Sequence, residues 1–149
     1  MVRFAQAICL LLVPIAMVCC SAAPKYPWDL AGKSIPPYRV LATDNPDNDQ
    51  YSVLYTLVVS VDGKSTRDDI RTISEKLIEN LPPLNGAIIF FVTDPSEKDK
   101  GWTVARMWWG LNDVAMNHND FSEAGDYSKN EMKIAMKGEE LPGDLVEKY

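Results

Sequence analysis

The sequence predicts an α+β domain in which one amphipathic helix covers one face of an antiparallel sheet of four or five strands. Three observations lead to this fold. Residues 65–81 have helical periodicity, five other segments have the composition or alternation of strands, and the connections between most of these segments are short. The order of the segments is β-β-α-β-β-β, which is typical of a two-layer α+β architecture.

The helix is the segment that the sequence marks most clearly. Ser65 or Thr66 can accept a hydrogen bond from a free N–H of the first turn. Pro82 ends the helix, because proline disfavours helical backbone in the residue before it. The apolar residues recur at intervals of three and four, so they form one stripe that should face the sheet, with Leu77 central in the core. These residues are Ile70, Ile73, Leu77 and Leu81.

Five segments have the features of strands. Residues 51–61 alternate between two faces, and residues 87–93 form a nearly continuous apolar run, as a buried strand does. Because the loops are short, we expect neighbouring strands to be antiparallel. The expected strands are residues 38–43, 51–61, 87–93, 102–109 and 131–137.

Residues 110–129 have no sustained periodicity. An irregular segment of this length is uncommon in a compact domain, so we expect either a functional loop or a partly disordered one. It holds His118, the one histidine of the chain. We interpret His118 as a surface residue, and a carboxylate-rich metal site formed by Asp113, His118 and Asp120 is the weaker alternative.

The N-terminus has the layout of a secretory signal peptide, predicted here as residues 1–22. Arg3 precedes a long apolar run, and Ser21 and Ala22 are small residues suited to cleavage. The run is shorter than the ~20 residues of a spanning helix, and Pro14 interrupts it, so we expect cleavage rather than a membrane anchor. The mature protein would then be periplasmic or secreted, without membrane insertion.

All three cysteines lie in this N-terminal segment, so its removal would leave no disulfide and no thiolate chemistry. The alternative is a bacterial lipoprotein anchored through Cys19 or Cys20, although neither follows the usual small residue. After the signal we expect a proline-rich leader over residues 23–37, one domain over residues 38–137 and a polar tail over residues 138–149.

Charge and motifs restrict the classes of function. The chain has a formal net charge of −6 and no basic stripe, which argues against binding nucleic acid or an anionic membrane surface. It has no nucleophile elbow, no dinucleotide glycine pattern and no zinc-protease motif. We therefore expect no cofactor and no enzymatic activity.

The strand over residues 102–109 is predicted to carry the most informative surface. Ala105 and Met107 suit the close approach of a helix, which would leave Val104 and three larger side chains on the opposite face. These three, Trp102, Arg106 and Trp108, are of the types enriched at binding hot spots and at stacking sites.

A bare face with two tryptophans would be large for a soluble monomer. Its cover could be Trp28 and Leu30 from the leader, or Phe121 and Tyr127 from the long irregular segment. Otherwise the face would be a binding surface or a homodimer contact.

Several of these segments together resemble a small bacterial domain family of unknown function. The similarity covers residues 51–61, the helix that opens Ser65-Thr-Arg-Asp-Asp-Ile, the paired phenylalanines of residues 87–92 and Gly101-Trp-Thr-Val-Ala. After Gly110, Leu111-Asn-Asp-Val stands in place of the closing turn of that family. The resemblance implies a bacterial envelope protein with this fold, and it implies no active residues.

These observations favour an exported, non-catalytic binding or assembly module of the bacterial cell envelope. Its expected partner is a protein or another envelope component. Two other classes stay open from the sequence, namely an inhibitor of an incoming lysozyme or protease and a small hydrolase with paired carboxylates.

Overall fold

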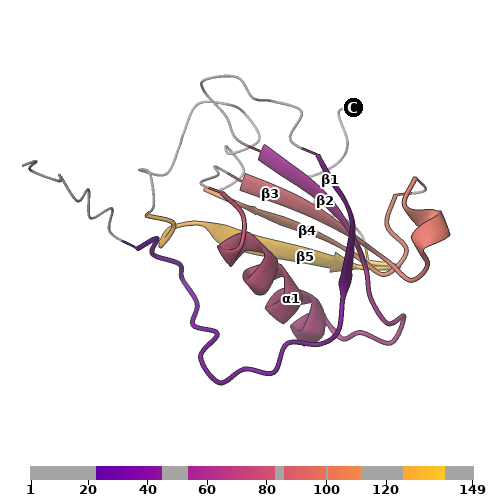
Figure 1. Ribbon diagram of the computed structural model, residues 1–149, viewed down its shortest axis with the longest axis horizontal. Coiled ribbons are helices and arrows are strands. Elements are labelled where there is room, and N and C mark those ends of the chain that lie inside the picture. Colours follow the sequence, from indigo (N-terminus) through magenta and orange to yellow (C-terminus); the bar gives the residue numbers. More distant parts are fainter. Residues whose placement is uncertain (1–22, 45–53, 83–85, 100, 112–125, 140–149) are drawn as a thin grey trace, which may run out of the picture.

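The computed structural model describes residues 23–44, 54–82, 86–99, 101–111 and 126–139, and the predicted signal peptide and most of the predicted tail lie outside them. The described residues form an α+β fold, with a five-stranded sheet and one α-helix (Figure 1). In chain order the elements are β1 (Arg39–Asp44), β2 (Leu54–Ser60), α1 (Arg67–Glu79), β3 (Gly86–Val92), the 3₁₀ turn η1 (Pro95–Glu97), β4 (Ala105–Gly110) and β5 (Glu131–Met136).

The sheet is mixed, so the expectation of a wholly antiparallel sheet is wrong. The strands lie in the order β1-β2-β3-β4-β5, and β2 and β3 are parallel, while the other three pairs are antiparallel. The physical reason is the crossover. Because α1 returns the chain to the end of the sheet where β2 begins, β3 runs in the same direction as β2.

Local hydrogen bonds define the start of α1. The Thr66 hydroxyl accepts from the Asp69 N–H at 3.2 Å, and the Asp69 carboxylate accepts from the Thr66 N–H at 2.8 Å. This reciprocal capping box identifies Thr66 as the N-cap. The hydrogen bonds from Thr66 also lower the pKa of Asp69. No helix in the described part of the chain is long and apolar enough to cross a membrane.

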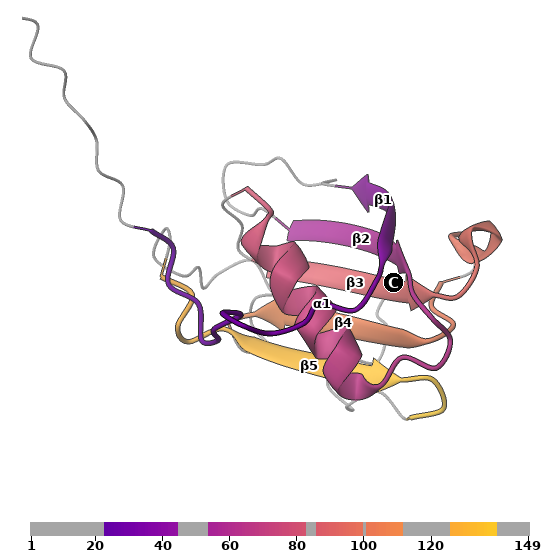
Figure 2. The ribbon, with the colours of Figure 1, turned by 60° about the horizontal axis from the view of Figure 1, so that its bottom comes forward.

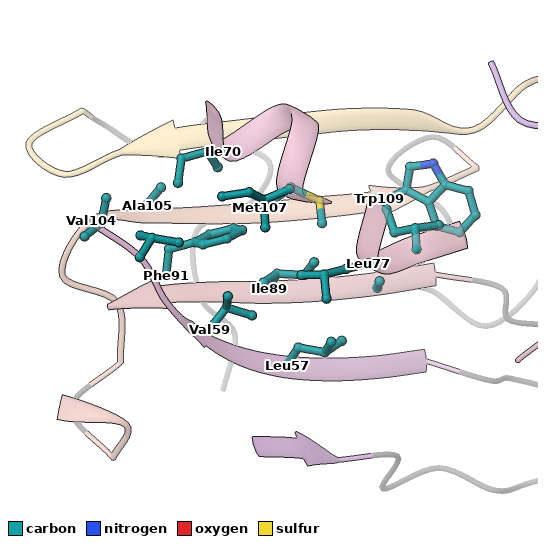
Figure 3. Packing of buried hydrophobic residues seen from close by; sticks show 14 of the residues in the cluster. Leu57, Val59, Ile70, Leu77, Ile89, Phe91, Val104, Ala105, Met107 and Trp109 are labelled. Atoms are coloured by element: carbon teal, nitrogen blue, oxygen red, sulfur yellow. The ribbon is translucent and has the colours of Figure 1, made fainter. Parts of the chain in front are cut away.

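The main core lies between α1 and one face of the sheet, as Figure 3 shows. Ile70 and Ile73 of α1 are fully buried, and Leu77 is 6% exposed. The prediction that Ala105 and Met107 face the helix is confirmed, since both are fully buried in this cluster. From the sheet, the cluster includes Leu57, Val59, Ala87, Ile89, Phe91, Ala105, Met107 and Trp109.

Val104 departs from the predicted alternation. It lies in the main core with the helix, whereas we expected it on the opposite face. The strand begins only at Ala105, and the N–H groups of Thr103 and Val104 both donate to the carbonyl of Phe91, at 3.0 and 2.9 Å. Two consecutive residues sharing one acceptor indicate a local irregularity, which turns Val104 toward α1.

Replacing Leu77 with alanine tests the position of the core. We expect a loss of about 2 to 4 kcal/mol in the free energy of unfolding, because the change leaves a cavity under α1. Arg71→Ala is the matched control on the exposed side of the same helix. Equilibrium urea unfolding measures both variants, and a loss below about 0.5 kcal/mol for Leu77→Ala would show that this helix face is not in the core.

Candidate binding surfaces

The face of the sheet opposite α1 carries a second, smaller hydrophobic cluster. Ile88, Trp108 and Ala135 form it, with Phe90 packed against them. These residues come from β3, β4 and β5. Trp108 is only 6% exposed and Arg106 only 7%, so this pair is not the bare surface that a binding patch would require.

Arg106 stacks on two aromatic rings of this face. Its guanidinium carbon lies 4.4 Å from the centroid of the Trp108 ring and 5.1 Å from that of the Phe90 ring. Strand register explains the second contact, because Phe90 is directly opposite Arg106 in the β3–β4 pair. The two cation–π contacts hold the guanidinium against the sheet.

The third residue of the predicted site does not join this pair. Trp102 precedes β4, is half-buried and belongs to neither hydrophobic cluster of the described residues.

The weaker candidate, the metal site, is not tested by the structure. Asp113, His118 and Asp120 lie outside the described residues, and so does Phe121. Within the described ranges, no group of three or more His, Cys, Asp or Glu side chains could hold a metal ion.

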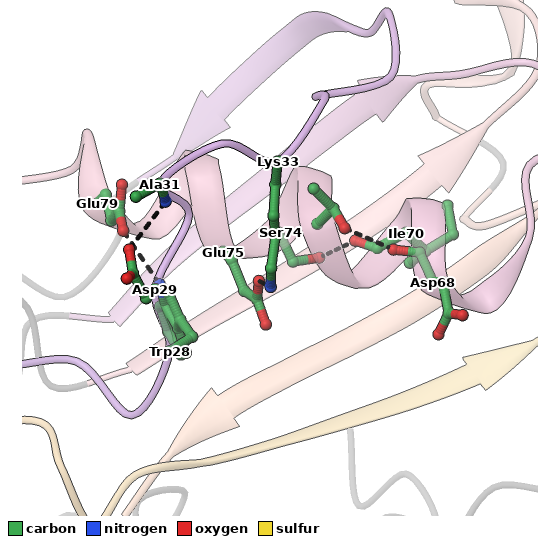
Figure 4. A network of polar contacts seen from close by, with 10 residues as sticks. Trp28, Asp29, Ala31, Lys33, Asp68, Ile70, Ser74, Glu75 and Glu79 are labelled. Atoms are coloured by element: carbon green, nitrogen blue, oxygen red, sulfur yellow. Dashed lines mark hydrogen bonds and ion pairs between the residues drawn. The ribbon is translucent and has the colours of Figure 1, made fainter.

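The leader lies on the helix side of the sheet, so the suggestion that it could cover the opposite face is wrong. Trp28 packs against the main core, and its Nε1 donates to the Glu79 carboxylate of α1 at 3.2 Å (Figure 4). Trp109, at the end of β4, presents its ring to this side and meets Trp28 edge to face, with centroids 5.9 Å apart. Burying the two aromatic surfaces together favours this path for the leader.

Tyr127 belongs to the same aromatic group, so it too lies away from the face that it was expected to cover. Its ring stacks on Tyr26 with centroids 5.3 Å apart and meets Trp109 edge to face at 5.3 Å. The Tyr127 N–H donates to the carbonyl of Lys25 at 2.8 Å. Burial, with Tyr127 and Glu79 nearby, raises the pKa of Tyr26.

A second polar contact holds the leader along α1. Glu75 is 3% exposed, although it is charged, and Lys33 Nζ lies 3.3 Å from its Oε2 (Figure 4). A buried carboxylate needs such a partner to offset its lost hydration. Figure 2 shows the leader crossing in front of α1 before it enters β1.

The two edge strands of the sheet differ in whether side chains hydrogen-bond to their outward-facing backbone N–H and C=O groups. At the β5 edge, the Arg67 guanidinium donates to the carbonyl of Ile134, and the Glu139 carboxylate accepts from the N–H of Met136 at 2.8 Å. Alternate residues of a strand direct their backbone groups to the same side, so both groups belong to the edge away from β4.

Arg67 and Glu139 also form an ion pair with each other, so the two backbone contacts at the β5 edge are linked. Arg67 Nη2 lies 2.6 Å from Glu139 Oε2. The hydrogen bonds from Arg67 and from the Met136 N–H lower the pKa of Glu139. Both side chains are nearly half exposed, so we assign the pair a positional role at the β5 edge and little net stabilisation.

β1, at the other edge, is open to solvent. Five of its six residues are exposed, and Val40, at 40%, is the one exposed large hydrophobic side chain among the described residues. In the described part of the chain, only β2 hydrogen-bonds to the β1 backbone. An exposed strand edge presents unpaired N–H and C=O groups that can pair with another strand.

Sequence reasoning missed both edges as functional features. Arg67 and Glu139 are 72 residues apart, and no periodicity links them. The edge position of β1 could have been predicted. Consecutive strands usually pair with each other, so the first strand pairs with the second, and it stays at the edge of the sheet when no later strand joins its other side.

Comparison of the chain with protein-family models, with curated proteins and with solved structures gives no match. The resemblance to a bacterial envelope family therefore stays a prediction. The two edges and the two faces of the sheet are the features from which function is inferred.

Tryptophan accessibility tests the placement of the two faces. Iodide should quench Trp102, which is half-buried, and should leave Trp108 unaffected. We expect Trp102→Phe to lower the quenchable fraction of the fluorescence and Trp108→Phe to leave that fraction unchanged. The opposite pattern would show that Trp108 lies on an open surface.

The same measurement tests the path of the leader. In a Trp102→Phe background, removing residues 24–35 should make Trp109 accessible, because the deletion takes away the Trp28 ring that packs against it. Adding Trp109→Phe should abolish this gain in quenching, whereas adding Trp108→Phe should not. If the gain in quenching is lost on adding Trp108→Phe, the leader covers the face away from α1.

Proposed function

We propose that the protein is an exported, non-catalytic binding or assembly module of the bacterial cell envelope, and that it binds an extended protein segment along β1. Export rests on the signal peptide that the sequence predicts. The observation that supports binding is the contrast between the two edges. β5 has side-chain partners on its outer edge, whereas β1 is exposed.

Strand addition suits the features of β1. A partner segment that pairs with this edge gains main-chain hydrogen bonds over the length of a six-residue strand. Val40 would lose its exposed apolar surface in the same step, which adds a hydrophobic contribution. Main-chain pairing supplies affinity, and the side chains of alternate residues supply selectivity.

The β5 edge is a poor competitor for the same partner. A strand that paired with β5 would have to displace Arg67 from the carbonyl of Ile134 and Glu139 from the N–H of Met136. Hydrogen bonds to charged groups are stronger than those between neutral groups, so this displacement costs more than replacing water on β1. Association is therefore directed to β1.

Arg106 and Trp108, which the sequence favoured as binding residues, have a different role in this proposal. Both are buried, and the Arg106 guanidinium lies over the Trp108 ring. A ligand that stacked on Trp108 would have to displace this arginine. We therefore place the binding surface at the exposed edge strand.

Site-specific photo-cross-linking in the producing cell tests this function. A photoreactive residue at Val40 or Thr43 should give a discrete cross-linked product, because both positions belong to the exposed edge strand. Glu131 is the matched control, since it is also exposed and lies on the opposite edge strand. Absence of any product at both β1 positions, or an equal yield of the same product at Glu131, would contradict the proposal.

A further inference from the structure

We infer that the segment that pairs with β1 is β1 of a second copy of this chain, so that two sheets join edge to edge about a two-fold axis. This inference rests on the proposed function, because it names the partner of the same edge. It follows from the position of the two charged residues of β1, Arg39 and Asp44, which lie at its ends.

Arg39 and Asp44 share one face of the sheet. Arg39 is opposite Ser60 and Asp44 is opposite Thr56 in the β1–β2 pair. Thr56 and Ser60 are four residues apart on a strand whose register with β3 is continuous, so their side chains point to the same face. Residues directly opposite each other also share a face, which places Arg39 and Asp44 together.

The bulge in β1 is the reason for this arrangement. Residues five positions apart on a regular strand point to opposite faces. The register of β1 shifts between Val40 and Ala42, which inserts one extra residue and brings Asp44 back to the face of Arg39. The face is the one away from α1, since Leu57 and Val59 occupy the helix side of β2.

This distribution makes the edge complementary to itself. Two β1 strands that pair antiparallel, with Arg39 of each opposite Asp44 of the other, form two cross-strand charge pairs. A two-fold axis normal to the sheet preserves the faces, so each pair lies on the side away from α1 in both copies. Between the charges, the residues Val40 to Thr43 carry no charge.

The same register accounts for the exposed valine. Val40 of one copy would lie opposite Thr43 of the other, and both residues face the helix side, because they pair with Val59 and Leu57. Val40 would thus be covered by the second copy. The contact involves one short strand from each copy, so we expect a weak, concentration-dependent dimer.

Charge reversal in the full exported chain tests the inference. Sedimentation equilibrium should detect a dimer for the natural sequence. Arg39→Asp alone places two aspartates opposite each other, and Asp44→Arg alone places two arginines opposite each other, so each should weaken the dimer by about tenfold or more. The double variant Arg39→Asp with Asp44→Arg restores both charge pairs and should restore the dimer.

The controls separate folding from association. Arg39 and Asp44 are exposed, and the double variant has the amino-acid composition of the natural chain, so its circular dichroism should be unchanged. Lys137→Glu, an exposed charge reversal just after β5, should leave the dimer unchanged.

Four outcomes would overturn the inference. A dimer that is insensitive to both single reversals, or one that the double variant fails to restore, would place the contact elsewhere. If the chain is monomeric up to its solubility limit and β1 cross-links to a different protein in the cell, then the partner is not a second copy of this chain. The proposed function, binding of a protein segment along β1, would still hold. A monomer with no cross-link at β1 would refute both.

Discussion

The crossover from β2 through α1 to β3 is the constraint on which the rest of the structure depends. It makes β2 and β3 parallel and sets α1 against one face of the sheet. One helix covers only one face, so the largest apolar cluster lies there, with Ile70, Ile73 and Leu77 as the contribution from α1. The remaining strands add on both sides of this parallel pair, which leaves β1 and β5 as the edges.

The parts of the fold that depend on local chemistry could be predicted from the sequence. The apolar stripe of α1, a cap at Ser65 or Thr66 and an end before Pro82 are all set by residues within a few positions of one another, and the structure places the cap at Thr66. The order of elements followed from the same reasoning. Strand direction did not, because the loop-length argument overlooked that a strand, a helix and a strand in succession indicate a parallel pair.

The features that sequence reasoning missed depend on distant contacts or on broken periodicity. Val104 was placed on the wrong face because strict alternation does not allow for the two N–H groups that share the carbonyl of Phe91. The leader was named as one possible cover of the opposite face, and its actual position could not be predicted because it depends on Trp109 and Tyr127, which are far away in the chain. Trp108 and Arg106 do share the face away from α1, and a cover for that face was considered, but Trp28 and Tyr127, which were suggested for it, pack in the main core instead.

In the mode of binding that we propose, side chains at the two sheet edges direct association without adding much stability. Arg67 and Glu139 are about half exposed, so their ion pair contributes little to folding, yet they occupy two outward backbone groups of β5. β1 has no equivalent among the described residues, and its bulge sets Arg39 and Asp44 on one face instead. Under the proposal, the occupied backbone groups of β5 and the charge pattern of β1 together restrict the ways in which this sheet can extend.

Amide hydrogen exchange measured by NMR tests the difference between the edges most directly. At a concentration low enough to keep the chain monomeric, we expect the Met136 amide to be protected and the alternate amides of β1 that do not donate to β2 to exchange quickly. Glu139→Gln should weaken the protection of Met136 and leave β1 unchanged. Outward amides of β1 that exchange as slowly as the Met136 amide in the monomer would contradict the open edge, and with it the proposed mode of binding.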